Sequence, residues 1–261
     1  MNIVVCVKQV PDTATIRFES EAERVDISGA TLIVNPMDEY ALEAGLRLRE
    51  EYGGKVTAIS LGSKETEETL RTALALGIDE GILISDPLFE GNDAYVTSYV
   101  LAQAIKKLGL FHLVLFGKSS SDSDTGWTGP AVAEFLGIPD VTFVKKIEEI
   151  SESRARVQRM MEEGYDLIET SLPAVFTVVK EINEPRLPSL KGKLKAKSHK
   201  IPIWTANDLD LDSTKIGKAG AKCEPLRVWV PEARKGGTFF QGEPEDVAAQ
   251  LVQALKKQQI I

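Results

Sequence analysis

The sequence predicts an α/β protein with a doubly wound, mostly parallel sheet, an antiparallel extension of that sheet and an extended C-terminal arm. Three observations support this fold class: short apolar runs rich in β-branched residues, helix-length segments between them, and a change of pattern after Pro139. Such apolar runs are typical of strands buried on both faces of a parallel sheet. Strands that alternate with helices predict right-handed crossovers and helices on both faces.

The alternation occupies the first half of the chain. The expected strands are residues 2–7, 55–62, 81–85 and 111–117. The expected helices begin at Asn35-Pro36, at Lys64, after Asn92-Asp93 and in the loop after Gly117. Glycines at 53, 77, 109 and 137 end these helices, as glycines commonly do.

The second half is organised differently. The runs "VTFVKKIEEI", "RARVQRMM", "YDLIETSL" and "AVFTVV" are joined by short turns and predict an antiparallel extension of the sheet. From Asn183 to Pro202 the chain is rich in Pro and Lys and lacks periodicity, which predicts an extended stretch. "LRVWV" predicts one more strand. The chain closes with a helix from about Pro244, whose apolar face consists of Val247, Leu251, Val252 and Leu255.

Length and composition limit the possible functions. The chain has 261 residues, which allows one large domain or one domain with extensions. A net charge of -8 argues against a nucleic-acid surface. Apolar runs fall short of the roughly 18 residues of a membrane span, and the N-terminal sequence does not resemble an export signal, so a cytoplasmic location is expected. Cys6 and Cys223 are far apart and suggest neither a disulfide nor a metal site.

The stretch "LVLFGKSSSDSDTGWTGPAVAEFLG", residues 113–137, carries the strongest sign of a ligand site. It leaves a strand end, where open parallel sheets bind their ligands, and enters a helix, whose first N–H groups favour anions. We therefore expect a phosphate site made of backbone donors and of the hydroxyls of residues 119–121, 125 and 128. Gly126 and Gly129 allow close approach of the backbone. Asp122 and Asp124 would repel a phosphate, so they are expected to cap the turn or to accept from ribose or adenine.

Several other functions are disfavoured. "GKS" at 117–119 lacks the preceding glycine of a P-loop, and Gly-x-Gly-x-x-Gly is absent. His112 and His199 lie in a strand and in the lysine-rich stretch, so we expect no catalytic triad and no catalytic residue. "KGKLKAKSHK", residues 191–200, contains five lysines. By itself it allows two interpretations, a solvated linker or a docking segment for an acidic partner.

Several motifs together resemble one family. "MNIVVCVKQVPDT", "NPMDEYALEAGLRLRE", "TLRTALALGID", residues 115–137 and "LPAVFTVVKEINEPRLPSLKGKLKAK" occur in the order found in the β subunit of electron transfer flavoproteins. The resemblance covers essentially the whole chain. It implies a Rossmann-like, adenine nucleotide-binding domain over residues 1–182, followed by a partner-recognition loop and a C-terminal arm with a helix, residues 183–261, that packs on an α subunit.

The resemblance also implies a nucleotide. In this family the β subunit holds AMP in conventional carriers and a second FAD in electron-bifurcating ones, and the ends "VCVKQVPDT" and "KKQQII" are similar to the bifurcating, anaerobic type. NADH would then donate a hydride to this FAD. The implied cofactor-binding residues are Cys6, Asn35, Pro36, Met37, Asp38, Leu61, Gly117, Lys118, Ser119, Ser120, Ser121, Asp122, Ser123, Asp124, Thr125, Gly126, Trp127 and Thr128. The family often has Gln-Ala-Ile-Asp after Gly-Lys, which differs from this chain.

The implied partners are an α subunit, a flavin-dependent dehydrogenase such as an acyl-CoA dehydrogenase, and ferredoxin or flavodoxin as the low-potential acceptor. The residues implied in docking are Arg186, Leu190, Lys191 and Lys195, with Leu190 as the anchor. Three functions stay open at this point: a bifurcating β subunit with FAD, a conventional β subunit with structural AMP, and a nucleotide-binding interaction protein without a redox role.

Overall fold

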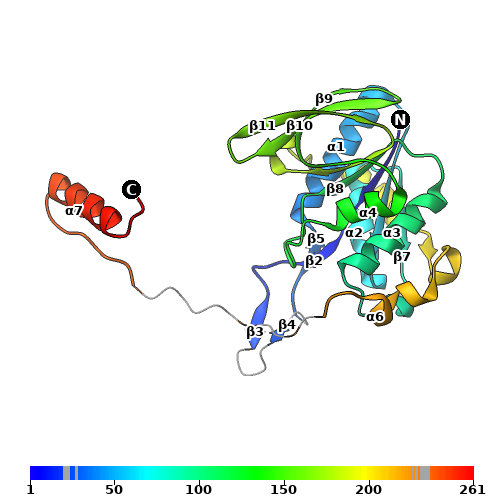
Figure 1. The fold of residues 1–261 in the computed structure, drawn as a ribbon. Helices are drawn as coiled ribbons and strands as arrows, with labels where there is room; N and C mark the ends of the chain where they lie inside the picture. Colours follow the sequence, from blue (N-terminus) through cyan, green and yellow to red (C-terminus); the bar gives the residue numbers. More distant parts are fainter. Residues whose placement is uncertain (20–23, 27–28, 225, 227–228, 230–235) are drawn as a thin grey trace. The chain divides into compact units, whose positions relative to one another are not determined.

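A nine-stranded sheet organises the larger part of the chain (Figure 1). The computed structural model describes residues 1–19, 24–26, 29–224, 226, 229 and 236–261. Contacts divide the chain into two compact units, Met1–Arg227 and Val228–Ile261. Within the described residues the strand order of the large sheet is β11-β10-β9-β12-β8-β1-β6-β7-β13.

The middle of this sheet is parallel. It consists of β12 (Ala174–Val178), β8 (Leu113–Gly117), β1 (Asn2–Cys6), β6 (Lys55–Leu61), β7 (Glu80–Ile84) and β13 (Ile203–Trp204). Ile3 pairs with Val56 on one side and with Leu113 on the other. The chain proceeds outward from β1 to β6 and β7 and then crosses to β8 on the opposite side of β1. The strand order therefore reverses between β1 and β8, which is where ligands of such sheets bind.

Helices cover both faces of the sheet, as the sequence predicts. Ile3 and Val5 of β1 belong to the core cluster that includes residues of α1 (Pro36–Tyr52) and α2 (Glu67–Leu76). Val4 and Cys6 belong to the cluster that includes residues of α3 (Ala94–Leu108) and α4 (Thr128–Leu136). Alternate residues of a strand point to opposite faces, so β1 contributes to both cores. The four expected helices and the four expected strands are confirmed, with end shifts of a few residues.

The antiparallel extension is formed by β9 (Asp140–Ile150), β10 (Arg154–Met161) and β11 (Gly164–Ser171). The run "AVFTVV" differs from the expectation, because β12 is parallel to both of its neighbours, β8 and β9. Every residue of β12 is buried, as is typical of a parallel strand inside a sheet. The extension therefore begins beyond β12 and not with it.

Short elements that the sequence analysis did not predict complete the first unit. β2 (Gln9–Pro11) pairs with β5 (Leu32–Val34), and β3 (Arg17–Glu19) pairs with β4 (Arg24–Asp26), both antiparallel. Single 3-10 turns are η1 (Lys64–Thr66), η2 (Pro87–Phe89), η3 (Lys180–Ile182), η4 (Ala206–Asp208) and η5 (Ser213–Lys215).

The stretch predicted to be extended contains a helix, α5 (Leu190–Ser198), which packs against α2. Its sequence does not favour a helix: it is short, contains Gly192, and repeats lysine at positions that bring like charges together. Beyond it, β13 joins the edge of the sheet, and α6 (Gly217–Gly220) follows. The helix expected near the C-terminus is α7 (Pro244–Lys257) in the second unit. Most of the predicted strand "LRVWV" lies outside the described residues. Among the described helices, none has the length and apolar character needed to cross a bilayer.

Phe176 offers a test of the core, because its ring is fully buried in β12. Replacing it with alanine leaves a cavity, and we expect the free energy of unfolding to fall by about 3–5 kcal/mol. Urea denaturation of the two proteins measures this difference. Leu110→Ala is the control, since 77% of the Leu110 side chain is exposed. Equal losses in the two variants would show that the sheet interior contributes less to stability than its burial indicates.

Candidate functional site

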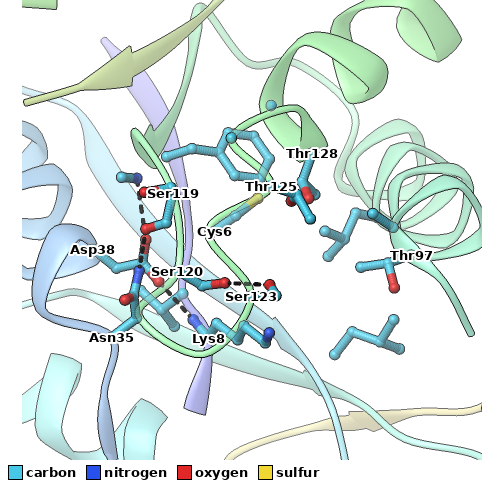
Figure 2. Close-up of a pocket in the computed structure, with 18 of the residues that line it drawn as sticks. Cys6, Lys8, Asn35, Asp38, Thr97, Ser119, Ser120, Ser123, Thr125 and Thr128 are labelled. Atoms are coloured by element: carbon cyan, nitrogen blue, oxygen red, sulfur yellow. Dashed lines mark hydrogen bonds between the residues drawn. The ribbon is translucent and has the colours of Figure 1, made fainter. Parts of the chain in front are cut away.

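A cavity of about 420 Å³ lies where the strand order reverses, beyond the carboxyl ends of β1 and β8. Its volume falls within the range of ligand pockets, roughly 300–1,000 Å³. Figure 2 shows Asn35, Asp38 and Lys8 on one side and Thr97 on the other, with Thr125 and Thr128 between them. The cavity is lined by Cys6, Val7, Lys8, Asn35, Asp38, Leu61, Asn92, Asp93, Ala94, Thr97, Leu101, Phe116, Gly117, Lys118, Ser119, Ser120, Ser123, Thr125, Gly126, Thr128 and Gly129.

Asp38 joins the two strand ends that border the cavity. Its Oδ2 accepts from the backbone N–H of Lys8 at 2.8 Å, and its Oδ1 accepts from that of Gly117 at 3.1 Å. The residue is only 5% exposed. Burial raises the pKa of Asp38 to about 7, although the two backbone N–H groups, Asn35 and Lys8 lower it. The carboxyl group therefore titrates near neutral pH at the floor of the site.

Asn35 holds the loop that follows β8. Its Nδ2 donates to the carbonyl of Ser119 at 2.9 Å, and its Oδ1 accepts from the N–H of Ser121 at 3.1 Å. Asn35 precedes α1 but does not cap it, because its amide is used by the loop. Both contacts are to backbone, so they fix the path of the loop.

The loop is also held by an ion pair. Lys8 Nζ lies 2.6 Å and 2.8 Å from the two carboxylate oxygens of Asp122. Burial raises the pKa of Asp122, but the bonds from Lys8 and Ser120 outweigh it and keep the pKa below its usual value. The Ser120 and Ser123 hydroxyls lie 2.9 Å apart, and Asp124 donates its N–H to the Ser120 carbonyl. The loop is therefore an ordered turn, and Asp122 lies outside the cavity lining.

Three glycines are required by this geometry. A Cβ atom on Gly117 would lie 2.5 Å from the carbonyl carbon of Met37, so β8 can approach the start of α1 only with glycine there. Gly126 has φ +69°, a left-handed conformation that favours glycine. Gly129 also lines the cavity, and its Cβ would lie 2.6 Å from Thr177 Cγ2, so glycine there lets α4 pack against β12.

The first residues of α3 form the opposite wall. Asp93 caps this helix by accepting from the N–H of Val96, and its other oxygen accepts from Lys222 and Cys223. Burial raises the pKa of Asp93, but these backbone N–H groups outweigh it and hold the pKa below its usual value. Ser98 donates to the carbonyl of Thr128, which links α3 to the start of α4. The sequence predicts a helix start at Asn92-Asp93, but it does not indicate that these residues belong to the site.

The lining is suited to binding an anion next to an apolar group. Lys8 and Lys118 bring ammonium groups, and α4 begins at Thr128, so the N–H groups of Thr128 and Gly129 have no partner within the helix. Val7, Leu61 and other apolar residues line the rest. Burial and then Asp38 raise the pKa of the Cys6 thiol, which stays protonated. No histidine is among the described residues that line the cavity.

Most of the predicted cofactor residues meet in this cavity. Residues that line it are Cys6, Asn35, Asp38, Leu61, Gly117, Lys118, Ser119, Ser120, Ser123, Thr125, Gly126 and Thr128. Residues outside the lining are Pro36, Met37, Ser121, Asp122, Asp124 and Trp127. Lining residues that the sequence pattern does not predict are Val7, Lys8, Asn92, Asp93, Ala94, Thr97, Leu101 and Phe116. Lys8 could have been found, because it follows directly after a strand that ends at the site.

The residues expected in docking lie elsewhere, around α5. Leu190, Lys191 and Lys195 are exposed. Arg186 is not free, because its guanidinium contacts Glu43 and Glu50 at 2.7 Å and 2.5 Å. It therefore attaches the segment before α5 to α1. Within the described residues there is no cluster of three or more His, Cys, Asp or Glu side chains arranged to hold a metal.

Asp38 gives the site a testable pH dependence. Because folding raises its pKa from 3.8 to about 7, the folded chain keeps a proton between these pH values that the unfolded chain has lost. Stability should therefore fall as pH rises through this window. Urea denaturation at pH 5 and pH 8 measures the fall, which we expect to be smaller in Asp38→Asn than in the wild type. The exposed Asp166→Asn is the control, and equal pH dependence in all three proteins would contradict the prediction.

Comparisons with known proteins identify related chains. Residues 25–209 match the model of the electron transfer flavoprotein domain. The chain is 40% identical to the electron transfer flavoprotein subunit beta of Thermoanaerobacterium thermosaccharolyticum and 37% identical to that of Clostridium acetobutylicum. It is 39% identical to the caffeyl-CoA reductase-Etf complex subunit CarD of Acetobacterium woodii. Each comparison covers 100% of this chain and 100% of the relative.

Two findings lead to one conclusion. The parallel sheet has a cavity where its strand order reverses, and full-length relatives share a subunit name. The chain belongs to the electron transfer flavoprotein family, as a β subunit of the kind that pairs with an α subunit in electron transfer.

Proposed function

We propose that the cavity binds the adenine nucleotide part of FAD, and that this chain is the β subunit of an electron-bifurcating electron transfer flavoprotein. The observation that carries the proposal is the cavity at the strand reversal, where ammonium groups, hydroxyls and free helix N–H groups lie beside an apolar wall. Family membership favours an electron-transfer role over a nucleotide-binding role without redox chemistry.

The donor set fits a nucleotide phosphate. We assign the phosphate to the N–H groups at the start of α4 and to the hydroxyls of Ser120, Ser123 and Thr125. Lys118 balances part of its charge, and the ion pair with Lys8 neutralises the Asp122 carboxylate at the edge of the loop. The apolar side chains of Leu61 and Leu101 suit the base. When bound, the flavin supplies the electron-transfer chemistry, while the chain binds and orients it.

The finer proposal of bifurcation rests on the sequence and on the relatives. The name of the relative from Acetobacterium woodii places it in a complex with a caffeyl-CoA reductase. By analogy we propose NADH as the electron donor, with a flavin-dependent dehydrogenase and ferredoxin or flavodoxin as acceptors. The alternative is a conventional β subunit with structural AMP, which the same donors would also fit.

Cofactor content tests the proposal directly. The chain is co-purified with its α subunit, the complex is denatured, and released FAD and AMP are quantified per heterodimer. We expect two FAD and no AMP, because the cavity would hold the second FAD. One FAD with one AMP would contradict bifurcation and support the conventional carrier.

We also propose that the surface around α5 docks a flavin-dependent dehydrogenase such as an acyl-CoA dehydrogenase. Leu187, Leu190 and Leu194 are exposed by 91%, 77% and 64%, and lysines surround them. An apolar anchor supplies affinity, while surrounding charges raise the rate of encounter with an acidic partner. Arg186 contributes to this surface indirectly, through its ion pairs with α1.

The helix of the second unit completes the proposal. α7 is amphipathic, and its apolar residues include the exposed Leu251 and Val252. An apolar helix face of this kind commonly packs against another surface. We propose that α7 packs on the α subunit.

A substitution at Leu190 tests the docking surface. We expect Leu190→Ala to raise the KM for the partner dehydrogenase by about tenfold, as loss of an interface anchor does. Nucleotide content should not change, since α5 is separate from the cavity lining. Leu110→Ala is a matched control, because Leu110 and Leu190 are both 77% exposed. If the two variants behave alike in steady-state electron transfer, Leu190 is not the anchor.

A further inference from the structure

α5 is a helix that its own sequence opposes. It has nine residues, whereas an isolated helix of fewer than about 12–15 residues is marginal in water. Lys191 and Lys195 are four residues apart, as are Lys193 and Lys197, so like charges repel on its surface. Gly192 further disfavours the helix. The helical conformation must therefore come from contacts with the rest of the chain.

One face of α5 lies directly against α2. A Cβ atom on Gly192 would lie 2.2 Å from the carbonyl oxygen of Ala75, a distance that real Cβ atoms do not show. Ala196, one turn later on the same face, is only 3% exposed. Small residues at positions 192 and 196 let α5 approach α2 closely. Gly192 therefore destabilises α5 as an isolated helix but allows it to pack against α2.

Arg71 of α2 stabilises the C-terminal end of α5. Its Nη1 donates to the carbonyl of Ala196 at 2.7 Å, and the carbonyls of Lys197 and His199 lie at 3.3 Å and 3.4 Å. The last carbonyls of a helix lack partners within the helix, and a cation there also interacts favourably with the helix dipole. An ion pair with Glu67 orients the Arg71 guanidinium.

The segment before α5 is attached separately, to α1. Asn183 Nδ2 donates to the carbonyl of Tyr40 at 2.9 Å, and Arg47 Nη2 donates to that of Glu184 at 3.1 Å. Arg186 forms the ion pairs with Glu43 and Glu50 described above. Ser189 then caps α5 by accepting from the N–H of Gly192 at 3.0 Å. Both ends of the segment are therefore fixed on the body of the first unit.

These attachments decide where the exposed leucines point. Leu190 and Leu194 are one turn apart, and Gly192 lies about half a turn from each, on the opposite face. We propose that Gly192 and Arg71 are positioning residues for partner docking: they hold α5 as a helix against α2, so that Leu190 and Leu194 are presented together on a preformed surface. This inference rests on the proposed docking function of α5.

Backbone hydrogen–deuterium exchange tests the positioning without any partner. It is measured on the heterodimer with its α subunit, in peptides that cover α5, for the wild type, Gly192→Ala, Arg71→Gln and Lys193→Ala. We expect exchange in α5 to become about tenfold faster or more in Gly192→Ala and Arg71→Gln, because local opening becomes easier. Peptides from β1 and β8 should be unchanged.

The Gly192→Ala variant distinguishes two explanations that predict opposite changes in the exchange rate of α5. Local helix propensity predicts that Gly192→Ala slows exchange, whereas close packing on Ala75 predicts faster exchange. Lys193→Ala is the control, since it raises propensity and removes a like charge at an exposed position, and it should not accelerate exchange. Slower or unchanged exchange in Gly192→Ala would overturn the proposal. If that variant also loosens β1 and β8, Arg71→Gln decides the question.

Electron transfer from an acyl-CoA dehydrogenase, used as the probe, tests the link to docking. We expect Gly192→Ala and Arg71→Gln to raise the KM for this flavoprotein by about tenfold with kcat unchanged, as Leu190→Ala does. Faster exchange with an unchanged KM, while Leu190→Ala raises it, would overturn the positioning role. An unchanged KM in Leu190→Ala would instead overturn the docking function itself, while the exchange data would still report how α5 is held.

Discussion

The site depends on one interaction: the buried side chain of Asp38 accepts hydrogen bonds from two backbone N–H groups. The donors, Lys8 and Gly117, follow or end the two central strands, β1 and β8, between which the strand order reverses. Strand ends that leave a sheet have unpaired backbone groups, and a buried group of this kind must find a partner. One side chain from the start of α1 satisfies both strands and sets the distance between the loops that follow them. Its near-neutral pKa is the consequence of keeping a carboxyl group in a buried position.

The rest of the cavity is arranged around this floor. Asn35 fixes the loop after β8 through backbone contacts, and Lys8 pairs with Asp122 at the edge of that loop. Lys8 pairs with the Asp122 carboxylate, which lies outside the cavity lining, so a loop with two aspartates can still lie next to a bound anion. A site built from ordered backbone and short side chains also has little conformational freedom to lose when it binds a ligand. This property suits a subunit whose role is to hold and orient a cofactor.

The sequence predicted one wall of the cavity well and the other poorly. Ser119, Ser120, Ser123, Thr125 and Thr128 follow a strand in one continuous stretch, so the rule that ligands bind beyond strand ends was enough to find them. Asn92 and Asp93 directly precede α3 and Thr97 lies in its first turn, and these residues reach the cavity because α3 packs next to α4. The sequence also does not show that Gly129 lies so close to Thr177 of β12 that a Cβ atom there would collide. The atoms that surround a Cα position are determined by tertiary packing, which the sequence of one segment does not specify.

The central strands and the four long helices were determined by local pattern. Continuous apolar runs can be buried only between two layers, and helical periodicity ended by glycine leaves few alternatives. The direction of β12 and the helix α5 were decided by tertiary structure. β12 has the composition of any buried strand, and only its position between β8 and β9 makes it parallel to both. α5 has like charges and a glycine that disfavour a helix. It is stabilised as a helix because Arg71 bonds its last carbonyls and because Gly192 lets it pack closely against Ala75 of α2.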